Sequence, residues 1–380
     1  DTDINIRGGI TMKRWIKNII ILCVVCLIGV TAAIWVNVVN KEEVSGETIG
    51  INIVPVNSFI TEQHSEDNQN INFNRGIKNI VCWGDSITYG LGSGEAFIEN
   101  EDGIIDASDW AYTDALAYYT GMNVYNLGVC GETSYDIALR QGGIKMYIGK
   151  SVTVKPGKKV RVSIVNADGD GVSLENFNGY ETNNAQVDNL VYVDDVLYQL
   201  SFSKGGVYIS LYEDTIRSVK IKKGAEVVTK AAHDMSADVL IIEMGSNGGW
   251  DDYDELISQY KAMIANSGTQ CYIIIGDTDN PDEAIDSENY NSSKEVGLND
   301  TLWEAALREA FGEHFINMRT YLMQNALDIT GKEANETDIE NLLDGRVPDS
   351  IKYDYTHLNG YGYYAYGAGV YEKGVELGYW

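Results

Sequence analysis

Short apolar runs alternate with helical patterns along most of the chain after residue 76. Five runs have the length and composition of strands that are buried on both faces. They lie at residues 80–83, 123–127, 239–244, 271–275 and 315–318, and each is bounded by Gly, Asp, Asn or Ser. Residues 251–266 place Leu256, Tyr260 and Met263 on one helical face, and residues 108–120 and 300–311 have helical patterns too. The alternation predicts a three-layer, doubly wound parallel sheet of five strands, as in flavodoxin-like folds.

Residues 144–228 break this alternation. Apolar and polar positions alternate there at 151–154, 160–164, 190–193, 197–202 and 207–211, with Gly-rich turns between them. Period-two stretches at this spacing are typical of antiparallel strands. The sequence therefore predicts a small antiparallel β-domain, inserted between the second and third strands of the parallel sheet.

The N-terminal region carries the pattern of a membrane anchor. Lys13, Arg14 and Lys17 precede an uncharged stretch from Ile19 to Val36, which is long enough to span a bilayer. The basic residues on its N-terminal side predict that the rest of the chain lies outside the cytoplasm. A cleaved signal peptide, with a small-residue site at 31–33, is the alternative and would make the protein secreted.

These patterns divide the chain into five segments. Residues 1–11 are expected to be an upstream segment, 12–39 a transmembrane signal anchor and 40–75 a tether. Residues 76–143 and 229–380 form the α/β domain, and 144–228 form the inserted β-domain. The five cysteines are too few and too scattered for a disulfide framework or a zinc site, so free thiols are expected.

The formal net charge of −28 limits the classes of molecule that the chain is expected to bind. Such an acidic chain repels phosphate backbones and anionic lipid surfaces, which argues against binding to nucleic acid. The sequence gives no indication of an oligomeric state.

Polar residues with catalytic potential follow the predicted strands. Ser86 lies in Gly84-Asp85-Ser86 after the first strand, Gly131 follows the second, and Asn247 follows the third. Ligands of doubly wound sheets bind beyond these carboxyl ends. A serine hydroxyl needs a base to become a nucleophile, and His357 can serve as that base. Asp354, three residues before His357, can fix the tautomer of the imidazole.

Four blocks carrying Ser86, Gly131, Asn247 and His357 in this order resemble those of the SGNH (GDSL-like) hydrolase family. The resemblance covers residues 77–143 and 229–380. It implies a serine esterase with Ser86, Asp354 and His357 as the catalytic triad. It also implies an oxyanion hole made of the Ser86 and Gly131 N–H groups and the Asn247 amide.

The sequence departs from that family after Asn247. It also lacks the nucleophile elbow of the α/β-hydrolase fold. Gly248, Gly249 and Trp250 follow Asn247, where the family often has Asp. Thr88 takes the place of the second glycine of a Gly-x-Ser-x-Gly elbow, which argues against an α/β-hydrolase.

A thiol nucleophile and a calcium site are two other possibilities in this region. Cys130 could act as a thiol nucleophile, but no basic residue is adjacent to it in the sequence. Asp277, Asp279 and Asp282 could bind calcium, or they could form a solvated loop. No metal and no cofactor is expected.

The expected substrate is an acylated small molecule or polysaccharide. SGNH relatives cleave acyl esters, thioesters and O-acetyl groups of sugars, and Trp250 and Tyr355 could stack on a sugar ring. We therefore expect a carbohydrate O-acetylesterase, with a lipase or general acyl esterase as the alternative. A catalytically silent, carbohydrate-binding surface protein is the alternative of another class, and transfer of the acyl group to a sugar is a further option.

Overall fold

The computed structural model describes residues 77–100, 103–172, 174, 189–203, 205–213, 217–289 and 292–380, which belong to one compact unit. A parallel sheet with the strand order β16-β15-β14-β1-β4 positions the candidate site. Its strands are β1 (Asn79–Gly84), β4 (Asn123–Gly128), β14 (Val239–Glu243), β15 (Tyr272–Ile275) and β16 (Phe315–Ile316). All five residues of β14 are buried, because β14 lies inside the sheet and helices cover both of its faces.

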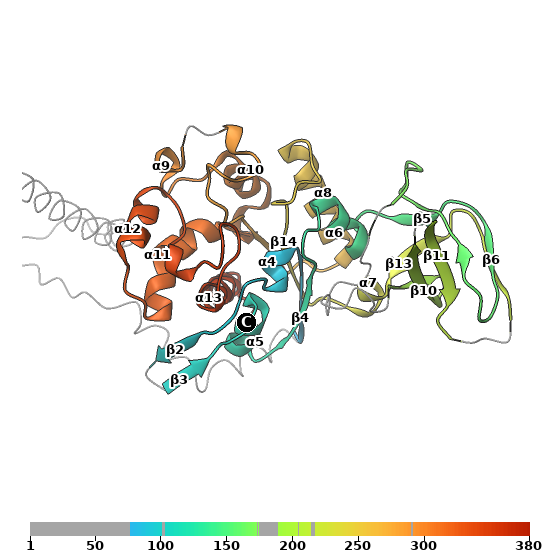
Figure 1. Cartoon of the computed structure of the whole chain (residues 1–380), viewed down its shortest axis with the longest axis horizontal. Helices are drawn as coiled ribbons and strands as arrows, with labels where there is room; N and C mark the ends of the chain where they lie inside the picture. Colours follow the sequence, from blue (N-terminus) through green and yellow to red (C-terminus); the bar gives the residue numbers. More distant parts are fainter. Residues whose placement is uncertain are drawn as a thin grey trace, which may run out of the picture. The chain divides into compact units, whose positions relative to one another are not determined.

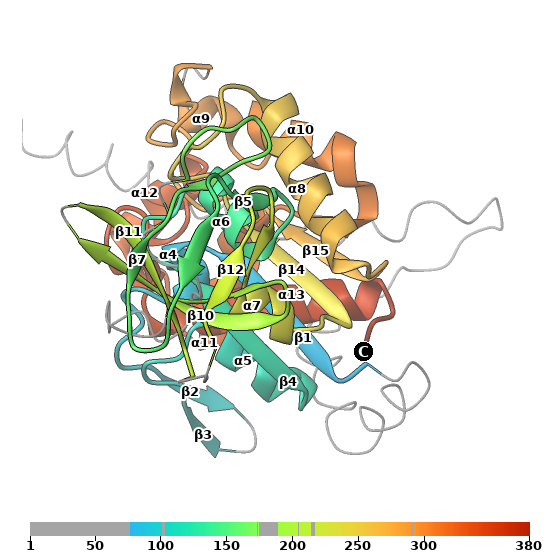
Figure 2. The ribbon, with the colours of Figure 1, turned by 90° about the vertical axis from the view of Figure 1, so that its right-hand side faces the viewer.

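Helices cover both faces of this sheet (Figures 1 and 2). One core contains residues from α5 (Tyr112–Thr120), α11 (Met318–Thr330) and α13 (Gly360–Glu376). The other contains residues from α6 (Ser134–Gln141), α8 (Tyr253–Ser267) and α10 (Leu302–Phe311). Shorter helices are α4 (Ser86–Tyr89), α7 (Lys230–Asp234), α9 (Ser293–Val296) and α12 (Glu336–Leu343), and a hairpin joins β2 (Phe97–Asn100) to β3 (Gly103–Asp106).

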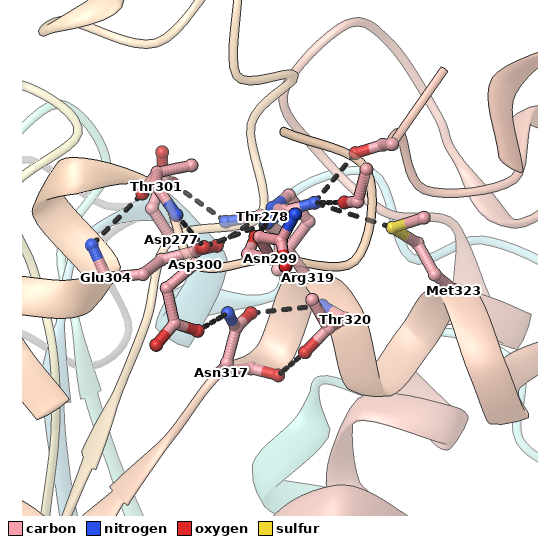
Figure 3. A network of polar contacts seen from close by, with 12 residues as sticks. Asp277, Thr278, Asn299, Asp300, Thr301, Glu304, Asn317, Arg319, Thr320 and Met323 are labelled. Carbon is pink, nitrogen blue, oxygen red and sulfur yellow. Dashed lines mark hydrogen bonds and ion pairs between the residues drawn. The ribbon is translucent and has the colours of Figure 1, made fainter. Parts of the chain in front are cut away.

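A buried ion pair between Arg319 and Glu304 joins α11 to α10 (Figure 3). Arg319 is 1% exposed, and its Nε and Nη2 atoms donate to the two carboxylate oxygens of Glu304 at 2.8 Å. Its remaining N–H groups reach the backbone oxygens of Gly297, Asn299 and Gly345, each at 2.8 Å. All five guanidinium donors are thus used, which fixes the segments before α10 and after α12 against α11.

The fold class expected from the sequence is wrong, because the β-structure of residues 144–228 is not a small appendage. It includes a seven-stranded antiparallel sheet with the order β7-β11-β10-β9-β13-β5-β8, which has more strands than the parallel sheet. The strands are β5 (Met146–Ile148), β7 (Val160–Arg161), β8 (Ile164–Val165), β9 (Leu190–Val193), β10 (Val196–Ser203), β11 (Gly206–Leu211) and β13 (Glu226–Thr229). A separate ribbon pairs β6 (Val152–Val154) with β12 (Val219–Ile221). Figure 1 shows these strands gathered together, in green to yellow.

This second sheet is curled. β7 and β8 lie at its opposite ends, although only Val162 and Ser163 separate them in the chain. Two residues can bridge two edges only where those edges come together, so the sheet must bend back toward itself. Its apolar side chains, among them Val191, Tyr198 and Ile209, pack into a core of their own.

The expected transmembrane helix at residues 12–39 lies outside the described residues, as do the segments 1–11 and 40–75. Within the part of the chain that the structure describes, no helix is long and apolar enough to cross a bilayer. The domain boundaries stay predictions.

Candidate active site

The turn after β1 places a serine at the start of a helix. Asp85 is the N-cap of α4, and its Oδ1 accepts a hydrogen bond of 3.0 Å from the N–H of Ile87. Ser86 is therefore the first helical residue. Gly84 is required before it, because a Cβ there would lie 2.0 Å from Thr88 Oγ1 and 2.5 Å from the backbone oxygen of Glu243.

Three of the residues expected from the sequence lie in hydrogen-bond contact. The Oγ of Ser86 is 2.8 Å from Nε2 of His357, and Nδ1 of His357 is 2.8 Å from Oδ2 of Asp354. A proton on Nδ1 is held by the carboxylate, which leaves Nε2 as the acceptor for the hydroxyl proton of Ser86. The structure thus brings a hydroxyl, an imidazole and a carboxylate into one hydrogen-bonded chain, as a Ser-His-Asp triad requires.

The turn that carries Asp354 and His357 is internally bonded. Oδ1 of Asp354 accepts the backbone N–H of His357 at 2.7 Å and that of Thr356 at 2.9 Å. Burial acts to raise the pKa of Asp354, but these hydrogen bonds and His357 outweigh it and hold the pKa below its ordinary value. Asp354 therefore stays ionised while His357 accepts a proton.

The oxyanion donors expected from the sequence include two backbone N–H groups, those of Ser86 and Gly131. Across the described ranges, the N–H groups of Ser86 and Gly131 donate to no protein acceptor. Gly131 has a left-handed φ of +76°, a conformation that favours glycine. Both N–H groups are thus available to a substrate oxygen.

Asn247 makes contacts that the sequence did not indicate. Its Nδ2 donates to Oδ2 of Asp85 at 3.2 Å and to the backbone oxygen of Glu132 at 3.1 Å. These two bonds join the loops after β1, β4 and β14. A developing oxyanion competes well for one of these hydrogens, because an ionised acceptor binds more strongly than a neutral carbonyl.

The loop that carries Asn247 is pinned to the start of α6. The backbone oxygen of Gly248 accepts the N–H of Ser134 at 2.9 Å and its hydroxyl at 3.1 Å. Gly249 lies so close to Thr133 that a Cβ would come within 2.7 Å of the threonine Cβ. Because α6 follows Gly131, this contact fixes the two oxyanion donors relative to each other.

Trp250 supports this loop from inside. Its Nε1 donates to the backbone oxygen of Gly245 at 3.0 Å, and its ring packs against those of Tyr253 and Trp303. The ring of Trp250 is thus partly buried against side chains of α8 and α10. Tyr355, by contrast, is 73% exposed and directly follows Asp354.

A buried ion pair lies behind Gly131. Arg140 contacts Glu132 with Nη2 at 2.7 Å, and the same nitrogen donates to the backbone oxygen of Leu127 at 2.8 Å. Burial raises the pKa of Glu132 to about 7, while the guanidinium of Arg140 acts to lower it. This pair fixes the segment between β4 and α6, on which Gly131 lies.

Buried carboxyl groups lie near Ser86, and the sequence pattern indicated no role for Asp85 or Glu243. Asp85 and Glu243 are 1% and 3% exposed, and Oε2 of Glu243 accepts a hydrogen bond of 3.2 Å from the hydroxyl of Thr88. Burial raises the pKa of Asp85 to about 6. Burial, together with the neighbouring acids, raises the pKa values of Glu243, Asp277 and Asp279 above their ordinary values. The one available signal was an acid at the end of an apolar strand, Glu243.

The structure gives contacts that bear on a thiol nucleophile and on a calcium site in this region. Cys130 is a free thiol on an exposed residue. Partial desolvation of the thiol, followed by the charge of Asp85, raises its pKa, which disfavours the reactive thiolate. Asp282 pairs with Arg346 at 2.6 Å. Among the residues in the described ranges, no group of three or more His, Cys, Asp or Glu is arranged to hold a metal ion.

Comparison with known proteins leaves these residues as the basis for any functional assignment. No protein-family model matches the chain, and no curated protein matches it.

Proposed function

We propose that this chain is a serine hydrolase that cleaves acyl esters with Ser86 as its nucleophile. The observation that carries the proposal is the continuous contact from Ser86 Oγ through His357 to Asp354, with both links at 2.8 Å. Among the described residues the N–H groups of Ser86 and Gly131 have no acceptor, which leaves them able to donate to an ester oxygen that becomes negative.

The reaction follows from this geometry. Nε2 of His357 takes the hydroxyl proton while Oγ of Ser86 bonds to the acyl carbon. The resulting oxyanion is stabilised by the N–H groups of Ser86 and Gly131 and by the Asn247 amide. The carbon–oxygen bond to the alcohol then breaks, and that alcohol leaves with the proton from His357. Water, deprotonated by His357, cleaves the acyl-serine in the same way and releases the acid.

We propose an acylated carbohydrate as the substrate and acetyl as its acyl group. Tyr353 and Tyr355 flank Asp354 and are 64% and 73% exposed, so their rings can stack on a sugar at the mouth of the site. Ile285 bounds the other side, because its Cδ1 lies 3.1 Å from the place of a Cβ on Gly248. A side chain so close to the oxyanion loop favours a short acyl group.

The test is hydrolysis of p-nitrophenyl acetate, butyrate and octanoate by the full chain and by Ser86→Ala. Ser258→Ala removes an exposed hydroxyl from α8 and is the matched control. We expect loss of acetate turnover in Ser86→Ala alone, with acetate preferred over octanoate. A preference for octanoate would support the lipase alternative. Equal rates for Ser86→Ala and the unaltered chain would remove Ser86 as the nucleophile and favour a silent carbohydrate-binding protein.

The place of action is a proposal as well. The basic residues before the apolar stretch at 19–36 support an N-terminal anchor with the hydrolase outside the cytoplasm.

A further inference from the structure

Charge is distributed very unevenly along this chain. Residues 144–228 carry 11 of the 28 Lys and Arg residues but only 10 of the 56 acidic residues. Their formal net charge is +1, whereas the rest of the chain carries −29. Self-repulsion of an acidic chain explains solubility, but it does not explain why basic residues concentrate in one segment.

The basic residues gather on two stretches that pair with each other. Residues 149–163 and 217–225 contain nine Lys and Arg residues and no Asp or Glu. β6 and β12 lie within these stretches and pair antiparallel, with Thr153 opposite Lys220. We call this surface the basic ribbon; its nine cations are Lys150, Lys155, Lys158, Lys159, Arg161, Arg217, Lys220, Lys222 and Lys223.

The cations occupy both ends of the basic ribbon. The N–H of Lys223 donates to Ser151 Oγ at 2.9 Å, which brings the turn at 222–224 next to Lys150. At the other end, the turn at 155–158 carries Lys155 and Lys158. A strand rises about 3.3 Å per residue, so Lys150 and Lys155 are separated by about 17 Å along the chain.

These side chains are available to a ligand. All nine are exposed. Leaving Arg217 aside, none of them forms an ion pair with another residue of the described ranges. By contrast, Lys145, just outside the ribbon, is paired with Glu226 at 3.1 Å.

We propose that the basic ribbon binds a linear anionic polysaccharide that lies along β6 and β12. The choice of a glycan among polyanions rests on the proposed function, in which the active site cleaves esters on carbohydrate. An extended chain of carboxylate-bearing sugars can touch both ends of a strip about 17 Å long. Lysine favours such a ligand, because its compact charge needs no fixed geometry of the partner.

Two other polyanions fit the basic ribbon less well. A flat anionic bilayer would also approach the acidic surface of the rest of the chain, which would repel it. A single polysaccharide chain need contact only the basic ribbon, because charges more than about 8 Å away are screened by salt. Single-stranded nucleic acid is bound with aromatic side chains on which bases stack. Residues 149–163 and 217–225 contain no aromatic residue.

The experiment measures binding of polygalacturonate by calorimetry to the full chain carrying Ser86→Ala, with neutral dextran as the blank. One variant replaces Lys150, Lys222 and Lys223 by Gln, and a second replaces Lys155, Lys158 and Lys159 by Gln. The control replaces the exposed Lys78, Lys261 and Lys294 by Gln, which changes the net charge equally.

We expect each ribbon variant to bind polygalacturonate at least tenfold more weakly, with the control within twofold of the parent. Binding should also weaken steeply between about 50 and 200 mM salt. Unchanged binding in both ribbon variants would overturn the proposal. Tighter ribbon-dependent binding of polyuridylate or of phosphatidylserine vesicles would overturn the choice of a glycan.

The esterase assay separates this result from the proposed function. Polygalacturonate carries no acyl ester and the parent lacks Ser86, so binding does not depend on hydrolysis. In the chain with Ser86 intact, both ribbon variants should keep their turnover of p-nitrophenyl acetate.

Discussion

Oδ2 of Asp85 accepts a hydrogen bond of 3.2 Å from Nδ2 of Asn247, so the residue before the proposed nucleophile also orients the proposed oxyanion donor. The other oxygen of Asp85 caps the helix that begins at Ser86. One buried carboxylate thus positions the attacking hydroxyl and a group that would stabilise the oxyanion.

Asp85→Asn should lower kcat for p-nitrophenyl acetate by about ten- to a hundredfold, with KM nearly unchanged. Asparagine can still cap α4, but an amide facing Nδ2 of Asn247 removes the acceptor that orients it, and loss of one oxyanion donor costs about 10²–10³ in kcat. Asp252→Asn, at the N-cap of α8, makes the same chemical change far along the chain and should leave kcat unaltered. A rise in KM with constant kcat would show that Asp85 acts on substrate binding instead.

Glu243→Gln should stabilise the protein, and more so at high pH. Burial, followed by the charges of Asp85 and Asp277, raises the pKa of Glu243 well above its ordinary value of 4.5. The folded protein therefore keeps a proton that the unfolded chain releases, so the free energy of unfolding falls as pH rises above 4.5. Glutamine is neutral at every pH and removes this loss.

The measurement is Tm for the unaltered protein and Glu243→Gln at about pH 5 and pH 8. A gain of about 2–4 °C at pH 8 that shrinks at pH 5 is expected for a chain of this size. The exposed Glu255→Gln on α8 is the matched control and should show no such pH dependence. An equal Tm difference at both pH values would contradict a proton held on Glu243.

Sequence patterns located the parallel strands but not the extent of the second sheet. Each of the five apolar runs overlaps one strand of the parallel sheet, because a strand buried on both faces is continuously apolar. β5, β12 and β13 have only three or four residues, too few to show alternation. The run at 160–164 was taken as one strand, whereas Val162 and Ser163 separate β7 from β8 at opposite ends of the sheet. Such a division depends on long-range pairing.

Part of the candidate site was predictable from the strands. Ser86, Gly131 and Asn247 follow strands whose ends the topology brings together, whereas His357 was indicated by Asp354 three residues before it and by the order of the four blocks. The side-chain contacts of Asn247 with Asp85 and Glu132 required coordinates, as did the inward orientation of Trp250. Asp277 and Asp279 are two residues apart, but Asp85 and Glu243 are far from them in the sequence, so the grouping of all four required coordinates.

Cys130 should be a site of inactivation and not a nucleophile. Cys130 is an exposed residue next to Gly131. Partial desolvation of its thiol and the charge of Asp85 raise the pKa of that thiol. N-ethylmaleimide should therefore react slowly at neutral pH and faster as pH rises, and the adduct should block the oxyanion donors. Cys130→Ser should keep acetate turnover within about twofold and resist the reagent. A loss of turnover above a hundredfold in Cys130→Ser would instead indicate a thiol nucleophile.

Ile285→Ala should extend the range of acyl chains that the site accepts. The Ile285 side chain is 49% exposed and reaches over Gly248, next to the oxyanion donor Asn247. Truncation removes three carbons, and one methylene is worth about 10–200-fold in discrimination between neighbouring acyl chains. We expect kcat/KM for p-nitrophenyl butyrate to rise relative to acetate, with Leu298→Ala, an exposed residue elsewhere, as the control. An unchanged ratio would place the acyl group away from Ile285.

Glu304→Gln should destabilise the protein far more than a surface change of the same kind. Glu304 is the carboxylate partner of the buried Arg319, whose charge would be left uncompensated, and breaking a buried pair costs about 3–5 kcal/mol. Glu376→Gln, which removes the partner of Lys373 at the surface, should cost about 1 kcal/mol or less. Urea unfolding of the three proteins measures both differences. Similar costs for the two variants would show that Arg319 keeps its charge satisfied through the backbone oxygens of Gly297, Asn299 and Gly345 alone.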